Sequence, residues 1–123
     1  MYNASIDSTE RVNYMRQYAC DLSTLQSKSK IRLMVNNRPV LLVFADGLPY
    51  AVADKCPHQG YSLFTGKYDN GIIACKEHGL QIDVRTGKVV NPLKATALRM
   101  DESEHSIKTY QVLVENDKVY FVL

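Results

Sequence analysis

The chain contains Cys56-Pro57-His58-Gln59-Gly60 and, with sixteen residues between His58 and Cys75, a second stretch Cys75-Lys76-Glu77-His78-Gly79. Each stretch brings one thiol and one imidazole within a few residues of each other. Two sulfur and two nitrogen donors suit zinc or an iron-sulfur cluster, whereas calcium and magnesium prefer oxygen ligands. The pattern therefore predicts a metal site with the candidate ligands Cys56, His58, Cys75 and His78.

Both stretches have the local features of loops that surround a bulky group. In an extended segment, residues two apart point to the same side, so Cys56 and His58 can face one target. Gly60 and Gly79 allow sharp turns and a close approach of backbone amides to an inorganic core. A small zinc finger usually takes both cysteines from one turn and both histidines from a helix, whereas each stretch here is a mixed pair.

The arrangement Cys-x-His, sixteen residues, Cys-x-x-His, with a glycine after each pair, resembles the binding motif of Rieske proteins. In that family a 2Fe-2S cluster has one iron held by two cysteines and the other by two histidines. The resemblance implies one 2Fe-2S cluster per chain, with Cys56 and Cys75 on one iron and His58 and His78 on the other. A structural zinc site is the main alternative.

The residues around the motif indicate a low potential. High-potential Rieske proteins carry a disulfide where this chain has Tyr61 and Glu77. They also carry a Ser and a Tyr that hydrogen-bond to the cluster where this chain has Leu80 and Ile82. Mixed ligation places the potential roughly between −150 and +300 mV, and fewer donors stabilise the reduced state less. The low end of that range is expected.

Short apolar runs alternate with turn signals through the rest of the chain. The turn signals are Asn36-Asn37-Arg38-Pro39, Asp46-Gly47, Asn70-Gly71, Arg85-Thr86-Gly87-Lys88 and Glu115-Asn116-Asp117-Lys118. Between them lie the predicted strands 31–35, 40–45, 50–53, 72–75, 80–84, 110–114 and 119–123. This spacing predicts an all-β sandwich or barrel.

The Rieske resemblance divides the chain further. It implies an antiparallel β-sandwich over residues 16–123, with a first strand at 16–20 and a small inserted cluster-binding subdomain at about 54–84. Residues 1–15 are expected to be a tail that contains a capping-box pattern at Asp7-Ser8-Thr9-Glu10.

Two segments after the motif have predicted roles of their own. Asn91-Pro92-Leu93 corresponds to a third loop that covers the cluster in the family. Residues 100–108 are longer and more acidic than the family usually has, and are expected to be a surface insertion with His105 in a solvated loop.

Composition excludes several classes of function. The chain has 123 residues, 46% of them hydrophobic, which fits one domain with an ordinary core. A net charge of +2 gives no sign of nucleic-acid binding. No run approaches the ~20 apolar residues of a membrane span, so no membrane association is expected. With two cysteines on iron, Cys20 is the one remaining thiol, which agrees with a reducing, cytoplasmic compartment.

The expected function is that of a soluble one-electron carrier with a Rieske cluster. A ferredoxin component would take electrons from a reductase and deliver them to an oxygenase or related redox enzyme. The chain itself is not expected to be an enzyme, because only His105 is left for a mononuclear iron site. The alternatives are a small Rieske subunit of a multisubunit reductase, such as nitrite reductase, and a zinc-stabilised binding module. The side chains expected to shield the cluster are Tyr61, Leu63, Leu80 and Pro92.

Overall fold

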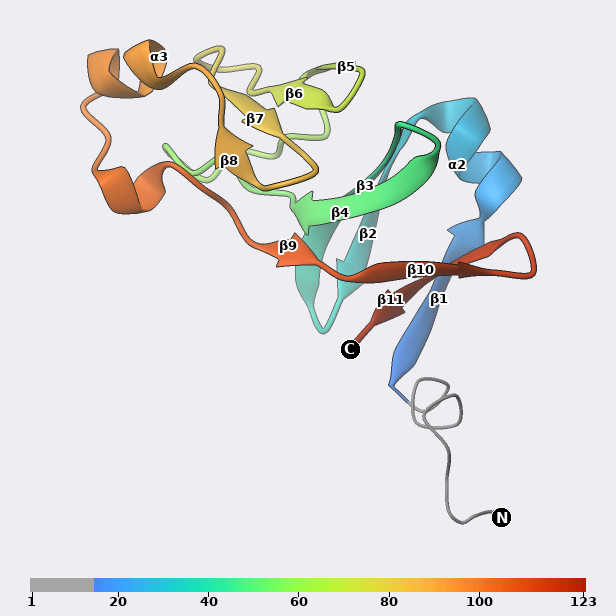
Figure 1. The fold of residues 1–123 in the computed structure, drawn as a ribbon. Coiled ribbons are helices and arrows are strands. Elements are labelled where there is room, and N and C mark those ends of the chain that lie inside the picture. Colours follow the sequence, from blue (N-terminus) through green and yellow to red (C-terminus); the bar gives the residue numbers. More distant parts are fainter. Residues whose placement is uncertain (1–14) are drawn as a thin grey trace.

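The computed structural model describes residues 15–123, which form three small antiparallel sheets and a few short helices (Figure 1). The predicted all-β class is confirmed. The elements in chain order are β1 Arg16–Asp21, α2 Leu22–Lys28, β2 Lys30–Val35, β3 Arg38–Ala45, β4 Leu48–Ala53, β5 Lys67–Asp69, β6 Ile72–Ala74, β7 Gln81–Asp83, β8 Lys88–Val89, α3 Pro92–Ala97, the 3-10 helix η1 Glu102–Glu104, β9 Thr109–Tyr110, β10 Val112–Glu115 and β11 Lys118–Val122. The capping-box pattern at 7–10 lies outside the described residues, as does the predicted tail up to residue 14.

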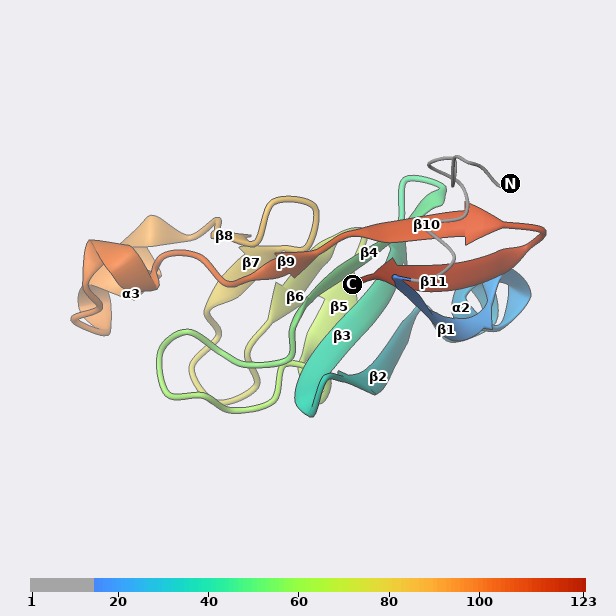
Figure 2. The ribbon, with the colours of Figure 1, turned by 90° about the horizontal axis from the view of Figure 1, so that it is seen from below.

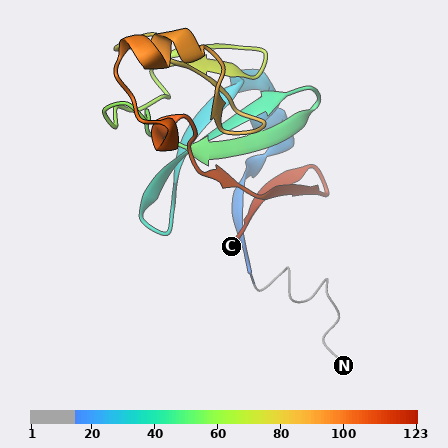
Figure 3. The same cartoon turned by 60° about the vertical axis from the view of Figure 1, so that its left-hand side comes forward.

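The three sheets lie next to one another, with the sheet that contains β3 in the middle. Its strand order is β2-β3-β4-β9, and the flanking sheets have the orders β1-β11-β10 and β5-β6-β7-β8. Figures 1 and 2 show β5 to β8 on one side of β3 and β4, and the β10–β11 hairpin on the other. In Figure 3, α3 lies at the top, at the end of the molecule opposite that hairpin.

Strand β3 is buried on both faces and separates two hydrophobic cores. Leu41 and Val43 belong to the core under β5 to β8, and Val40 and Leu42 belong to the core next to β1 and β11. All four side chains are fully buried. A strand covered on both faces has no polar side, which explains the unbroken apolar run at 40–45.

The predicted hairpin at 36–39 is shorter than expected. Asn36 and Asn37 alone form the turn, with φ values of 50° and 63°. Asparagine tolerates positive φ, and two such residues make the tight turn whose twist suits antiparallel strands. Pro39 lies within β3, opposite Met34. The four-residue turn was therefore wrong by two residues, although the hairpin itself is present.

The predicted strand 110–114 is two strands that belong to different sheets. Tyr110 in β9 pairs with Ala51 in the middle sheet, whereas Val112 in β10 pairs with Phe121 in the outer sheet. The chain thus changes sheets at Gln111. This crossing ties the end of the chain to both the middle and the outer sheet.

The segment 100–108 is not a simple surface insertion, which corrects the expectation from the sequence. The Val89 N–H donates to the His105 carbonyl over 2.8 Å, and the Ile107 N–H donates to the Gly87 carbonyl over 2.7 Å. Met100 and Ile107 also pack against the core. The ring of His105 is half-buried, and its Nε2 is buried without a hydrogen-bond partner, so this residue does not lie in a solvated loop.

None of the helices in residues 15–123 has both the length and the apolar character that crossing a bilayer requires.

Candidate metal centre

The two predicted ligand stretches form two loops with the same backbone closure. The first loop, residues 56–60, follows β4, and the second loop, residues 75–79, connects β6 to β7. In each loop the cysteine N–H donates to the carbonyl five residues later, and the glycine N–H donates back to the cysteine carbonyl. These bonds are 2.7–2.8 Å long and involve Cys56, Gly60 and Tyr61 in the first loop and Cys75, Gly79 and Leu80 in the second.

The glycines serve the turn itself. Gly60 has a φ of 78° and Gly79 a φ of 71°, in the left-handed region that glycine adopts without steric cost. Their N–H groups donate to the cysteine carbonyls and are not available to the sulfur atoms. Other amides make that contact in the first loop. The N–H groups of His58 and Gln59 donate to the sulfur of Cys56, which favours its thiolate form.

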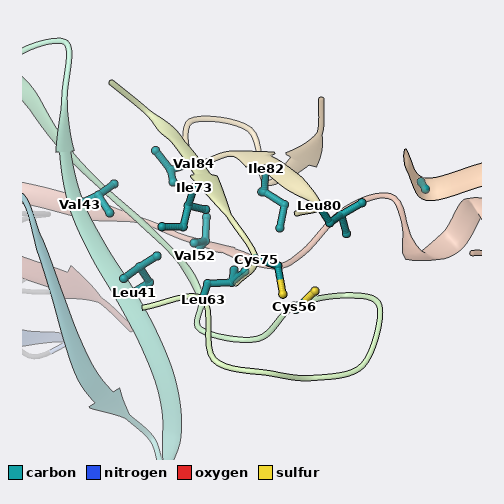
Figure 4. Packing of buried hydrophobic residues seen from close by; sticks show 11 residues of the cluster. Leu41, Val43, Val52, Cys56, Leu63, Ile73, Cys75, Leu80, Ile82 and Val84 are labelled. Atoms are coloured by element: carbon teal, nitrogen blue, oxygen red, sulfur yellow. The ribbon is translucent and has the colours of Figure 1, made fainter. Parts of the chain in front are cut away.

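The two thiols form the buried end of the site. Cys56 is 1% and Cys75 is 2% exposed, and neither is in a disulfide. Their sulfur atoms face each other beside Leu63 and Leu80 (Figure 4). Burial, with a further contribution from the neighbouring Cys75, raises the pKa of the Cys56 thiol to about 11. A metal ion would have to displace this proton, because thiolate is the ligating form.

The two imidazoles form the more exposed end of the site. His58 and His78 are half-buried, and their ring centroids lie 4.6 Å apart at an interplanar angle of 82°. The two Nδ1 atoms face each other at 3.4 Å. Two nitrogens bound to one tetrahedral metal at about 2.0–2.1 Å each would lie about 3.3–3.4 Å apart. The pair therefore has the spacing for joint ligation of one metal ion through Nδ1.

The donors come together as two pairs. In residues 15–123, no three His, Cys, Asp or Glu side chains converge in the way that a mononuclear site requires. The structure brings Cys56 next to Cys75 and His58 next to His78. A sulfur pair and a nitrogen pair suit the two irons of a Rieske cluster, whereas a structural zinc ion needs all four donors around one point.

The predicted shielding residues have different environments. Leu63 and Leu80 are fully buried in the same core as the two cysteines. Tyr61 is 46% exposed, with its ring 6.5 Å from that of His78. Pro92 and Leu93 lie in the first turn of α3, and Leu93 is 85% exposed. The expected covering loop at 91–93 is thus the start of a helix, which proline at the first helical position favours.

Two residues support the loops in a way that the sequence did not predict: Asn91, which was assigned only to the covering loop, and Asp54, which was not singled out. Asn91 bridges the second loop, since its Oδ1 accepts from the Gln81 N–H over 2.9 Å and its Nδ2 donates to the Gly79 carbonyl over 3.0 Å. Asp54, two residues before Cys56, is the one charged residue among those classed as buried in the described chain. An Asn before Pro and an Asp beside Lys both resemble ordinary turn residues, so the sequence carried no clear signal for either.

Comparison with known proteins identifies the family that the motif resembles. Residues 15–111 match the family described as Rieske [2Fe-2S] domain. The ferredoxin component of the alkene monooxygenase system of Xanthobacter autotrophicus is 33% identical over 91 residues, covering 73% of this chain and 70% of that protein. The biphenyl dioxygenase ferredoxin subunit of a Pseudomonas species is 29% identical over 83 residues, covering 67% of this chain and 76% of that protein.

A solved structure supports the same fold. The ferredoxin of carbazole 1,9a-dioxygenase from Nocardioides aromaticivorans IC177 superimposes with a TM-score of 0.73, covering 88% of this chain and 97% of that chain at 20% sequence identity. Its likeness concerns the fold, while the sequence matches concern the family. The chain therefore belongs to the Rieske [2Fe-2S] domain family.

Proposed function

We propose that this chain is a one-electron carrier, the ferredoxin component of an oxygenase system. It would take electrons from a reductase and pass them to an oxygenase or a related redox enzyme. The observation that carries this proposal is the pair of Nδ1 atoms 3.4 Å apart above a pair of buried thiols. The relatives support it, because one is the ferredoxin component of an alkene monooxygenase system and the other the ferredoxin subunit of a biphenyl dioxygenase.

The proposed ligands are the four residues of the two loops. Cys56 and Cys75 would hold one iron through sulfur, and His58 and His78 the other through Nδ1. When bound, a 2Fe-2S cluster supplies one-electron redox chemistry. The protein buries the thiolate end almost completely and leaves the imidazole end half-buried. Electrons would therefore leave on the side of His58 and His78, because electron transfer needs a short path to the partner.

We also propose a potential at the low end of the Rieske range. The side chains of Leu80 and Ile82 are fully buried and have no hydrogen-bond donor. Tyr61 and Glu77 stand where a disulfide would need cysteines. A midpoint above about +150 mV in a redox titration would contradict this assignment.

The domain boundaries and the location in the cell belong to the same proposal. The Rieske domain would span 16–123, with a cluster-binding subdomain at about 54–84 that contains both loops. A cytoplasmic location is supported by Cys20, the one thiol left when Cys56 and Cys75 hold iron, because no disulfide within the chain is then possible.

The decisive experiment is metal and sulfide analysis of protein purified without oxygen. We expect two iron atoms and two acid-labile sulfides per chain, with a paramagnetic signal after reduction. His58→Ala and His78→Ala should lose the cluster, while Cys20→Ala, which removes the thiol outside the site, should keep it. A colourless zinc protein without sulfide would refute the proposal. Co-purification of a large reductase subunit would instead favour the small-subunit alternative.

A further inference from the structure

The two loops share the same backbone closure but differ in how the segments that flank them are held together. The second loop connects two paired strands, and the pair formed by Ala74 and Gln81 directly precedes Cys75. The first loop leaves β4, which pairs with β3 and β9, and the next strand, β5, pairs with β6. Strand pairing therefore does not join the segments that flank the first loop, and another contact has to bring residues 54 and 64 together.

The carboxylate of Asp54 makes this contact. Its side chain is fully buried and accepts four hydrogen bonds. Oδ1 accepts from the backbone N–H groups of Leu63 and Phe64, at 2.8 Å each. Oδ2 accepts from Ser62 Oγ and Arg32 Nε, at 2.6 Å each. One carboxylate thus joins the segment before the first loop, the segment after it and strand β2.

A second basic side chain of β2 reinforces this closure. Lys30 and Arg32 are two residues apart, so they project from the same side of the strand. Lys30 Nζ donates to the carbonyls of Phe64 and Gly66. A buried carboxylate is costly unless its acceptor sites are filled, and the four donors fill those of Asp54. The free-energy cost of burying this carboxylate indicates that Asp54 has a role in placing the first loop.

The closure acts on the ligands through short covalent and packing paths. Cys56 is two residues after Asp54, and its N–H donates to the Tyr61 carbonyl. Tyr61 directly precedes residues 62–64, which donate to Asp54. Leu63, held by Asp54, is fully buried in the core that contains both cysteines. The His58 amide, which donates to the sulfur of Cys56, lies within this same loop.

We propose that Asp54 is the positioning residue of the metal centre, closing the first loop so that Cys56 and His58 are in place before metal binds. This inference rests on the proposed function, since it assigns the role to a cluster site. It predicts that the loop geometry already depends on Asp54 in the metal-free protein.

The test compares Asp54→Asn with a matched control, Asp46→Asn. Asp46 also accepts from an arginine Nε, that of Arg85, but it lies in the turn between β3 and β4. Asp54→Asn should shorten the lifetime of the cluster under chelator by roughly 10–100-fold, as expected for a residue that supports metal ligands. Ser62→Ala removes one of the four donors and should shorten it by about fivefold. Asp46→Asn should leave it unchanged.

Hydrogen exchange of the metal-free proteins gives a readout independent of the cluster. Asp54→Asn should speed exchange in peptides covering residues 55–66, while exchange in β3 and β4 stays as in the wild type. Equal cluster lifetimes for Asp54→Asn and Asp46→Asn would overturn the inference, as would faster exchange spread evenly over the whole chain. If the wild type itself contains no iron and sulfide, the proposed function fails, and the exchange data still decide whether Asp54 closes the loop.

Discussion

Replacing Gly79 by alanine tests whether backbone shape at the second loop holds the metal centre. Gly79 has a φ of 71°, and a Cβ there would meet Lys94 Cε at 3.5 Å, an ordinary contact. Space is therefore available, and the cost comes from the left-handed backbone alone. For an alanine this cost is about 1–2 kcal/mol.

Gly47 provides a control with nearly the same backbone. Its φ is 78°, and a Cβ there would meet nothing within 4 Å. It lies in the turn between β3 and β4, away from both loops. Because the strain is the same, Gly47→Ala and Gly79→Ala should each lower the Tm of the metal-free protein by about 4–8 °C.

The two variants should differ in cluster retention. In Gly79→Ala the strain is relieved when the second loop opens, so cluster loss should accelerate by a factor of about 5–30, which corresponds to 1–2 kcal/mol. Gly47→Ala should lose the cluster at the wild-type rate. The assay follows the visible absorbance under chelator, with thermal melts of both variants by circular dichroism. Equal rates of cluster loss for the two variants, at equal losses of Tm, would refute the reasoning.

Three further predictions use other contacts. Val43→Ala and Val40→Ala remove the same group from opposite faces of β3, so each should lower the free energy of unfolding in urea by about 2–3 kcal/mol. Only Val43→Ala, in the core that contains the cysteines, should shorten the cluster lifetime. Asn91→Ala removes two hydrogen bonds of the second loop and should cost about 1–3 kcal/mol, measured in the same way. The hydrogen bond from Arg85 lowers the pKa of Asp46, so the free energy of unfolding should fall as the pH drops below about 4, and Asp46→Asn should flatten this dependence in urea titrations from pH 3 to 6.

Much of the fold could be predicted because its signals are local. Strands β2, β3 and β4 are apolar runs between turns, and the alternation in β11 leaves Val119 and Phe121 buried. Helix α2 could not be predicted, because its two apolar residues, Leu22 and Leu25, are too few to show a helical period. Strands β5 and β8 have three and two residues, too few for any pattern.

The candidate ligands could be predicted because they lie close together in the sequence. The residues that support them could not, because their partners lie on distant segments of the chain. The metal-binding side chains are two residues apart in the first loop and three apart in the second, so their spacing in the sequence is enough to identify them. Asp54 finds its donors at Arg32 and at residues 62–64, on two other segments of the chain. Its role depends on the folded arrangement of β2 beside the loop. Contacts between distant segments produce no recognisable pattern in the amino-acid sequence.

The double burial of β3 links the metal centre to the stability of the whole chain. Leu41 and Val43 share a core with Cys56 and Cys75, while Val40 and Leu42, on the same strand, pack with Val119 and Phe121 near the C-terminus. A cluster bound at the thiol end would therefore stabilise the core under β5 to β8 directly. The cluster would stabilise the outer sheet only indirectly, through β3 and its neighbours in the middle sheet, because these strands pack against both cores. Release of metal should thus loosen the two loops first and leave the pairing of β1, β10 and β11 for last.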